Sequence, residues 1–224
     1  MKLYIVTTPI GNLEDFSPRA QRILNEVDFI ACEDTRVTKK LTDHFNIQKS
    51  LISFHAQSSA VKMKEILDLL QEGNDLALVS DAGTPGINDP GGKLIEEALK
   101  LFGDEISIIP IPGPSALTTI LSISGFPAEL FTYLGFPPNK KGREKFFKNI
   151  VQTEETVVFL ESTYRIIKAL ETLKELMPNR KIVVGRELTK LYESVYRGTS
   201  EEVLEKIKKG STKGEFVVVL SPIK

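Results

Sequence analysis

The feature that most limits the fold of this chain is a regular alternation of short apolar runs with longer amphipathic stretches. Runs rich in Val, Ile and Leu occur at 3–7, 29–33, 51–54, 76–80 and 106–111. The stretches between them carry helix signals. Ser17-Pro18 is typical of a capped helix start, and another helix is expected from Pro90 to about Phe102. Between them, five apolar side chains share one face of 59–71: Val61, Met63, Ile66, Leu67 and Leu70. The alternation predicts an α/β protein.

The same rhythm starts again after Pro112-Gly113-Pro114. A predicted helix at 115–124 is followed by apolar runs at 130–136, 156–161, 181–188 and 214–220, with helices expected at 163–176 and 200–209. We therefore expect two α/β domains, residues 1–113 and residues 114–224. One continuous sheet remains an alternative at this point.

Several loops that follow predicted strands have an unusual composition. They are TPIGN at 8–12, EDTR at 33–36, SDAGTPGINDPGG at 80–92 and PGPSA at 112–116. In open α/β sheets, ligands bind outside the carboxyl ends of the strands, and glycine lets a ligand approach the backbone. No GxGxxG opens a helix after the first strand, and no GxxxxGK[ST] occurs. The loops therefore predict a backbone-lined site for a ligand other than a dinucleotide or a nucleoside triphosphate.

Composition excludes several classes of protein. With 29 Lys and Arg against 30 Asp and Glu, the net charge is -1, so any contact with nucleic acid must be a local patch. Cys32 is the only cysteine, and His44 and His55 have no ligand-like spacing, so we expect neither a disulfide nor a metal. No apolar run has the length of a signal-peptide core or a membrane span, which indicates a soluble, cytoplasmic protein.

Six segments carry a resemblance to a known family. In chain order they are LYIVTTPIGNLED, FIACEDTRVTKKL, LVSDAGTPGINDPG, PIPGPSAL, GFPPNKKGR and RELTKLYESVYRGT. As a set, they resemble the small-subunit ribosomal RNA methyltransferase I family of the tetrapyrrole methylase superfamily. The resemblance implies two α/β domains with S-adenosylmethionine in a cleft between them, and usually a homodimer. The implied reaction is methylation of the ribose 2′-hydroxyl of a cytidine in 16S ribosomal RNA.

The resemblance also implies which residues bind the cofactor. They are Pro9, Gly11, Asp81, Ala82, Gly83, Ile87, Ser115, Ala116, Phe159, Glu161, Leu188 and Gly214. S-adenosylmethionine carries no phosphate. Its sulfonium, amino-acid end, ribose and adenine suit backbone carbonyls, a carboxylate such as Asp81 and an apolar side chain such as Ile87.

Charged residues at predicted strand ends are candidates for catalysis. A ribose hydroxyl is a poor nucleophile near neutral pH, so a base or an electrostatic stabiliser is expected beside it. The candidates in EDTR, RELTK and KGE are Glu33, Asp34, Glu187, Lys190, Lys213 and Glu215. From these we select Lys190, Glu33 and Glu187, with a preference for Lys190 because a desolvated lysine loses its proton more readily. For Glu33 and Asp34 the alternative is a cap on the helix that opens at Thr35.

The strongest local cluster of positive charge is NKKGREKFFKN at 139–149. Lys140, Lys141 and Arg143 are predicted to contact RNA phosphates. Phe146 and Phe147 could stack on a base, but they fit the buried face of a helix better. A second candidate for RNA contact lies beside EDTR and comprises Arg36, Lys39 and Lys40.

Two other functions remain open from the sequence. One is a methyltransferase that acts on a tetrapyrrole precursor or another small acceptor, because one cofactor-binding fold serves several acceptors. The other is a noncatalytic ribosome-assembly factor.

Overall fold

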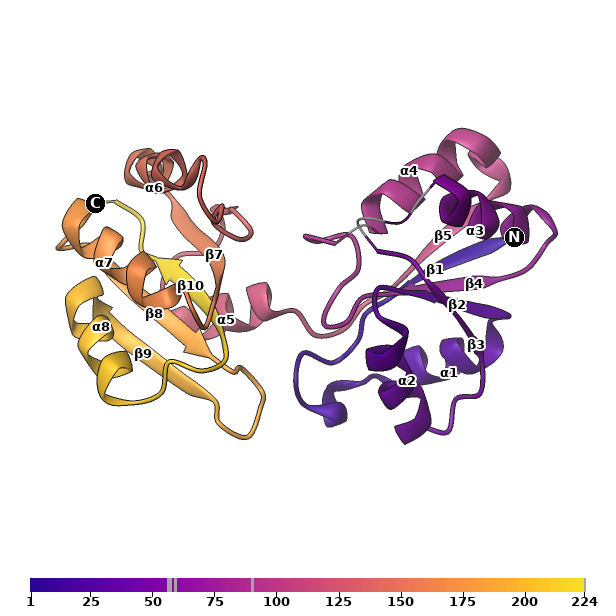
Figure 1. Cartoon of the computed structure of the whole chain (residues 1–224), viewed down its shortest axis with the longest axis horizontal. Helices are drawn as coiled ribbons and strands as arrows, with labels where there is room; N and C mark the ends of the chain where they lie inside the picture. Colours follow the sequence, from indigo (N-terminus) through magenta and orange to yellow (C-terminus); the bar gives the residue numbers. More distant parts are fainter. Residues whose placement is uncertain (56–57, 59, 90, 224) are drawn as a thin grey trace. The chain divides into compact units, whose positions relative to one another are not determined.

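A computed structural model describes residues 1–55, 58, 60–89 and 91–223. The chain forms two compact units, Met1–Ser115 and Ala116–Lys224, and each unit has its own five-stranded sheet (Figure 1). The predicted α/β class is therefore confirmed. The alternative of one continuous sheet is wrong. The division between the units lies close to the predicted domain boundary at 113/114.

The first unit is a parallel sheet covered by helices on both faces. Its sheet order is β3-β2-β4-β1-β5, and every pair is parallel. The strands are β1 Lys2–Val6, β2 Phe29–Cys32, β3 Ser50–Ser53, β4 Leu76–Val79 and β5 Ser107–Ile111. The helices are α1 Pro18–Glu26, α2 Thr35–His44, α3 Ala60–Gln71 and α4 Gly91–Phe102, with short 3-10 turns η1 Leu13–Asp15 and η2 Gly103–Glu105.

Alternate residues of the central strands supply the two cores of this unit. Leu76 and Leu78 of β4 pack with α3 and α4, whereas Ala77 and Val79 pack with α1 and α2. Figure 1 shows these helix pairs on opposite faces of the sheet. All four residues of β4 are buried, as expected for an inner strand of a parallel sheet.

The second unit has a mixed sheet of order β6-β7-β10-β8-β9, in which only β6 and β7 pair in parallel. The strands are β6 Phe131–Tyr133, β7 Thr156–Ser162, β8 Lys181–Arg186, β9 Ser194–Thr199 and β10 Glu215–Leu220. The helices are α5 Ala116–Ser124, α6 Arg143–Gln152, α7 Ile166–Leu176 and α8 Ser200–Lys209. Helices α6, α7 and α8 pack on one core cluster, and α5 packs on another.

The structure confirms most predicted elements and corrects some details. Ser17 caps α1 by accepting a 3.1 Å hydrogen bond from the Ala20 N–H, as predicted. Val61, placed by sequence on the apolar face of α3, is 74% exposed, so that assignment was wrong. Strand β9 was not predicted, and the helix expected from 163 begins at Ile166. Pro90, the predicted start of α4, lies outside the described residues.

Candidate functional site

The first unit brings three of the predicted loops together at Gly83. Thr8 and Gly83 exchange two backbone hydrogen bonds of 3.0 and 3.1 Å, which join the loop after β1 to the loop after β4. A side chain at Gly83 would lie 3.4 Å from Ile10 Cγ2 and 3.7 Å from the Pro114 carbonyl oxygen. The predicted cofactor residues Pro9, Gly83 and Ser115 therefore lie in, or directly beside, one group of converging loops.

Buried hydroxyl groups lock this junction, and the sequence analysis missed them. The Thr8 hydroxyl donates to the Ser80 carbonyl at 3.1 Å, and the Ser80 hydroxyl donates to the Gly83 carbonyl at 3.2 Å. The hydroxyls of Thr7 and Thr84 lie 3.4 Å apart. The sequence signal for this junction was the pair Thr7-Thr8 directly after a buried strand. Because β-branched residues favour strands, the strand predicted at 3–7 includes Thr7.

The Gly113 backbone lies close to the Thr7 side chain at the last loop of this edge. A Cβ atom at Gly113 would lie 3.1 Å from both Cβ and Cγ2 of Thr7, so a larger residue there would require the Thr7 side chain to shift. Further along the loop after β4, Ala82 and Ile87 are exposed, and Ile87 is 52% exposed despite its apolar side chain. Gly11 is exposed in the loop after β1. The edge therefore offers backbone and one free apolar side chain, which fits a ligand without phosphate.

Carboxylates gather beside these loops at the end of β2. The Asp34 N–H donates to Asp81 Oδ1 at 3.0 Å, which connects EDTR to the loop after β4. Burial raises the pKa of Glu33, and the negative charges of Asp81 and Asp89 raise it further. Loss of hydration likewise raises the pKa of Asp81. The structure thus brings the predicted catalytic Glu33 close to the predicted cofactor ligand Asp81.

Asp34, in contrast, has the structural role that was the alternative in the sequence analysis. It is the N-cap of α2 and accepts a 2.8 Å hydrogen bond from the Arg36 N–H. Its side-chain hydrogen bonds with Arg36, together with that backbone bond, lower its pKa to about 2. Arg36 is therefore ion-paired to Asp34 at 2.6 Å, and Lys39 pairs with Asp43 at 2.6 Å. Among the described residues, the exposed Lys40 has no ion-pair partner.

In the second unit, three of the charged candidates form one network where β8 ends and β10 begins. Lys190 Nζ lies 3.0 Å from Glu187 Oε1 and 2.9 Å from Glu215 Oε2. Burial lowers the pKa of Lys190, but the hydrogen bonds that its ammonium group donates to Glu215 and Glu187 outweigh this effect, and the pKa is raised. Desolvation thus acts in the direction expected for Lys190, but the two carboxylates stabilise the ammonium form and reverse the net direction. Burial alone would raise the pKa of Glu187, but the Glu215 N–H and Lys190 lower it, which makes Glu187 a weak base.

Gly214 closes this network from the next strand. It has a φ of +119°, and a Cβ atom there would lie 2.5 Å from Glu187 Cγ. Thr163 holds it in place, since the Thr163 hydroxyl accepts from the Gly214 N–H at 2.8 Å and donates to its carbonyl at 2.6 Å. The other predicted cofactor residues on this unit are less accessible: Phe159 and Leu188 are buried in the core, and Ala116 packs against it at the start of α5.

Glu161 lies in a buried ion-pair cluster at the end of β7. Its carboxylate lies 3.0 Å from Arg143 Nη2 and 2.8 Å from Arg165 Nε. Arg143, predicted to bind RNA, thus has its charge paired inside its own unit. Lys140 and Lys141 are exposed and, within the part of the chain that the structure describes, have no ion-pair partner. Phe147 is buried and Phe146 packs on the same core, which confirms that both lie on the inner face of a helix.

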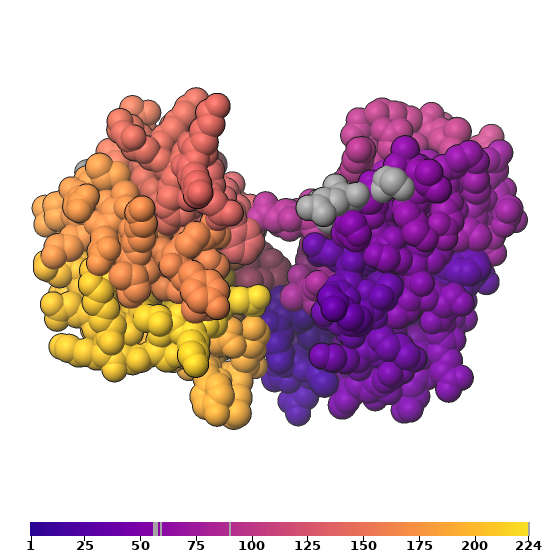
Figure 2. All heavy atoms as spheres, in the orientation of Figure 1, coloured from indigo at the N-terminus to yellow at the C-terminus, as the bar shows by residue number. Residues whose placement is uncertain are grey.

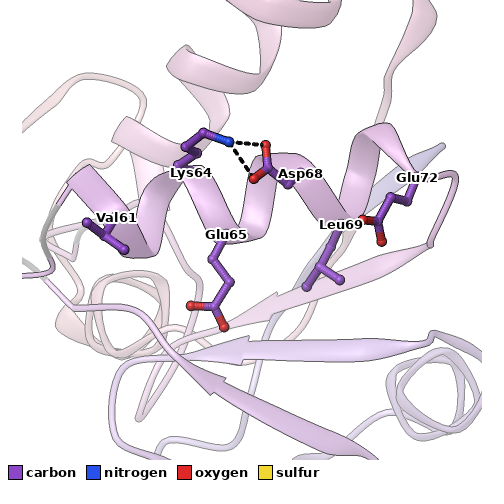
Figure 3. Close-up of a pocket in the computed structure, with 6 residues that line it drawn as sticks. All are labelled: Val61, Lys64, Glu65, Asp68, Leu69 and Glu72. Carbon is purple, nitrogen blue, oxygen red and sulfur yellow. Dashed lines mark hydrogen bonds and ion pairs between the residues drawn. The ribbon is translucent and has the colours of Figure 1, made fainter.

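A shallow hollow on the first unit is not part of these sites. Figure 3 shows it along α3, where the Lys64 ammonium binds the Asp68 carboxylate at 2.6 and 2.9 Å. Its lining residues are Val61, Lys64, Glu65, Asp68, Leu69 and Glu72. None of them is a candidate residue, so the hollow supports no catalytic role.

Two further searches apply to the described residues only. Within them, no three His, Cys, Asp or Glu side chains gather as metal ligands. No described helix combines the length and apolar character needed to cross a membrane.

The tetrapyrrole (corrin/porphyrin) methylase family matches residues 2–204 of the chain. The chain belongs to this family. The family resemblance seen in the sequence is thereby confirmed, and with it the expectation of a methyltransferase.

Curated relatives within this family align with the chain from end to end. The ribosomal RNA small subunit methyltransferase I of Hydrogenobaculum sp. strain Y04AAS1 is 45% identical and covers 99% of this chain and 96% of its own length. The protein of that name from Thermotoga maritima is 44% identical, with 98% of each chain covered. The one from Escherichia coli O157:H7 is 43% identical and aligns over 98% of this chain and 77% of its own length.

Solved structures show the same fold at much lower identity. A diphthine synthase has a TM-score of 0.73 at 15% identity, covering 99% of this chain and 90% of its own. A uroporphyrin-III C-methyltransferase from Thermus thermophilus, complexed with S-adenosylhomocysteine, has a TM-score of 0.66 at 18% identity. The match covers 99% of this chain and 97% of that protein. These two solved structures therefore share an architecture with the chain.

Proposed function

We propose that the protein methylates the ribose 2′-hydroxyl of a cytidine in 16S ribosomal RNA within the small ribosomal subunit, with S-adenosylmethionine as the methyl donor. The observation that carries the proposal is the 45% identity to a ribosomal RNA small subunit methyltransferase I over 99% of this chain. Identity at this level over nearly the whole chain favours RNA over the other acceptors that the fold serves.

The loops of the first unit fit such a donor. S-adenosylmethionine supplies a methyl group on a positively charged sulfur. Backbone at Gly83 and Gly113, the Asp81 carboxylate and the exposed Ile87 provide polar and apolar contacts without a phosphate-binding nest. Phe159, Leu188 and Gly214 remain predicted cofactor residues, and for the buried Phe159 and Leu188 the backbone is the available contact. The Glu161 carboxylate, in contrast, is already engaged by Arg143 and Arg165 inside its own unit.

Glu33 is the base that its surroundings favour. The acceptor hydroxyl must give up its proton as the ribose oxygen gains the methyl group. Burial and two neighbouring carboxylates raise the pKa of Glu33, which brings its basicity closer to that needed near neutral pH. Glu33 therefore takes this proton and later releases it to water. Lys190, held as an ammonium by Glu187 and Glu215, acts as a fixed positive charge rather than as a base.

The exposed lysines provide the RNA contacts in this proposal. Lys140, Lys141 and Lys40 carry charges that are not used in ion pairs within the described residues, so they are available to phosphates. Arg36 and Lys39 reach phosphates only by giving up their present partners. A homodimer, a cytoplasmic location and the absence of a metal remain predictions.

One experiment tests the function directly. The protein is incubated with small subunits that lack the modification and with labelled S-adenosylmethionine, and the labelled nucleotide is mapped in 16S RNA. We expect one labelled cytidine whose 3′ phosphodiester bond resists alkaline hydrolysis, because the 2′-oxygen is blocked.

Three results would contradict the proposal. A label on a base would exclude ribose methylation. Transfer to a tetrapyrrole precursor but not to small subunits would support the small-acceptor alternative. Binding to small subunits without any transfer would indicate a noncatalytic assembly factor.

A further inference from the structure

We propose that Glu161 is a positioning residue for RNA binding: through Arg143 and Arg165 it holds the loop at 136–142, so that Lys140 and Lys141 meet the ribosomal RNA in a fixed arrangement. This inference rests on the proposed function. It differs from the role implied by the family resemblance, which makes Glu161 a cofactor residue.

The Glu161 carboxylate is fully engaged inside the second unit. Its side chain is 0% exposed at the end of β7. Oε1 accepts a 2.8 Å hydrogen bond from the Ser162 N–H and lies 2.8 Å from Arg165 Nε, while Oε2 lies 3.0 Å from Arg143 Nη2. A buried carboxylate must be paired in this way, because an isolated charge away from water is strongly unfavourable.

The two arginines use their remaining N–H groups on the loop. Arg165 Nη1 donates to the Pro137 carbonyl at 3.2 Å and to the Asn139 side-chain oxygen. Arg143 Nη1 donates to the Pro138 carbonyl at 3.4 Å. Three consecutive loop residues are thus tied to one buried carboxylate.

Both arginines are themselves held in place. The guanidinium carbon of Arg143 lies 5.1 Å from the centre of the buried Phe147 ring. Arg165 Nε also donates to the Ser162 hydroxyl at 3.0 Å. Their side chains are only 11% and 25% exposed, so neither is free to move to a phosphate without breaking the cluster. The planar fork of arginine suits this double role better than lysine does.

The loop ends in exposed positive charge. Lys140 and Lys141 directly follow the tethered Asn139, and the Lys140 carbonyl accepts a 3.2 Å hydrogen bond from the Arg143 N–H at the start of α6. In Figure 2 the salmon-coloured segment that contains this loop and α6 lies at the surface of the second unit. Two prolines further limit the loop, so less conformational freedom is lost when a ligand binds.

Fixing the loop in this way explains why the buried cluster of Glu161, Arg143 and Arg165 lies at the end of β7. A well-packed apolar cluster would stabilise the fold at least as well, so stability alone does not account for it. A carboxylate with two arginines, in contrast, fixes loop carbonyls in defined directions. The cluster therefore serves the shape of the basic loop.

The test is a thermodynamic cycle on RNA affinity with purified full-length protein and unmodified small subunits. The variants are Glu161→Gln, the double variant K140A/K141A, and the triple combination. We expect K140A/K141A to weaken binding about tenfold and to reduce the salt dependence by about one phosphate contact per lysine. Glu161→Gln should weaken RNA binding to a similar extent in the wild-type background. In the K140A/K141A background it should change the affinity by less than about twofold, because coupled residues are not additive.

Two readouts separate positioning from general damage. Affinity for S-adenosylmethionine, measured by calorimetry, should be unchanged by Glu161→Gln, and the KM for small subunits should rise while kcat at saturation is retained. If Glu161→Gln does not fold, Arg165→Gln replaces it, since that side chain is partly exposed and removal should loosen the loop at Pro137 and Asn139. Lys64→Ala on α3 serves as a surface control.

The inference is overturned if Glu161→Gln and Arg165→Gln leave RNA affinity unchanged, or lower it equally in both backgrounds. It is also overturned if K140A/K141A binds like the wild type, or if loss of S-adenosylmethionine binding accounts for the defect. Failure of the proposed function has a different signature: the wild type then transfers no methyl group to small subunits.

Discussion

At the scale of single residues, Glu33 and Asp34 take different roles although they are neighbours in the sequence. Asp34 caps α2 and pairs with Arg36, which lowers its pKa to about 2. Glu33 is half-buried beside Asp81 and Asp89, and its pKa is raised. The sequence left a helix cap open as the alternative for both carboxylates, but it could not say which of the two forms it. The answer depends on a loop more than forty residues away, at Asp81.

Replacing Glu33 by glutamine should remove the base and keep the volume of the side chain. We expect the kcat of methyl transfer to fall on the order of 100-fold or more, with little change in affinity for S-adenosylmethionine. In the wild type, kcat should rise with pH as Glu33 loses its proton and then level off, and the variant should lack this rise. Transfer rates measured across pH check both points, with Lys64→Ala as a control. Retention of the wild-type pH profile by the variant would place the base elsewhere.

The same substitution should affect stability with a defined sign. The folded-state pKa of Glu33 is raised above its usual 4.5, so its contribution to stability is fully present below pH 4.5 and is lost as pH rises through the folded pKa. At pH 7 the wild type therefore carries an unfavourable charge that Glu33→Gln lacks. The variant should unfold at a higher Tm at pH 7, by no more than about 2–4 °C, the shift that about 1 kcal/mol gives in a chain of this size. Scanning calorimetry should show this gain disappear near pH 4.

At the scale of elements, the sequence identified the strands that carry apolar runs and missed β9, which lacks such a run. Strand β9, Ser194–Thr199, pairs with β8 at the edge of the sheet, and every residue in it is exposed or half-buried. Its signal is therefore weak, because edge strands need no apolar run. The strand predicted at 181–188 was two residues too long. Strand β8 ends at Arg186, because Glu187 has a φ of +51° and the chain leaves the sheet there.

The candidate site in the second unit depends on a register that the sequence does not contain. Strand β10 is antiparallel to both β7 and β8, with Glu215 opposite Ser162 and Phe216 opposite Arg186. The start of β10 therefore meets the ends of β7 and β8, and Lys190 lies between Glu187 and Glu215. Sequence analysis named these charged residues as separate candidates. It could not show that Lys190 pairs with both carboxylates.

Gly214, directly before β10, is the position where one added methyl group tests the contact between two strand ends. Gly214→Ala places a Cβ atom 2.5 Å from Glu187 Cγ in a backbone with a φ of +119°. We expect a loss of about 1–3 kcal/mol in the free energy of unfolding, from strain and from displacement of Glu187. Gly125→Ala is the matched control in the same unit, since Gly125 has a φ of +75° and nothing within 4 Å of the new Cβ. Urea unfolding compares the two.

The outcome separates two explanations for Gly214. A larger loss for Gly214→Ala than for Gly125→Ala, accompanied by a lower methyl-transfer rate, would show that the contact with Glu187 matters. Equal losses would mean that only backbone conformation is at stake, and that the Glu187–Lys190–Glu215 network tolerates the change.

At the scale of the whole molecule, the predicted cofactor residues are divided between two units with separate cores. The first unit contributes loops at the carboxyl ends of parallel strands, a position that the βα rhythm of the sequence predicts directly. In the second unit, most of the predicted cofactor residues lie in or beside strands of a mixed sheet, and Ala116 starts α5. The alternation of strands and helices in the sequence predicts no common edge for such residues. The family resemblance, rather than periodicity, is what named Leu188 and Gly214.

Binding of S-adenosylmethionine should therefore be visible in both units. We expect hydrogen exchange to slow at backbone amides of 80–89 in the first unit and of 187–190 in the second, while the core of α3 around Ile66 is unaffected. At a ligand concentration about 100 times the Kd, ligand binding raises the free energy of unfolding by about 2.7 kcal/mol in each unit that takes part in binding. Protection confined to the first unit would remove Leu188 and Gly214 from the predicted cofactor residues. Equal protection by ATP would contradict the inference of a phosphate-free ligand, because the loops around Gly83 would then be acting as a phosphate site after all.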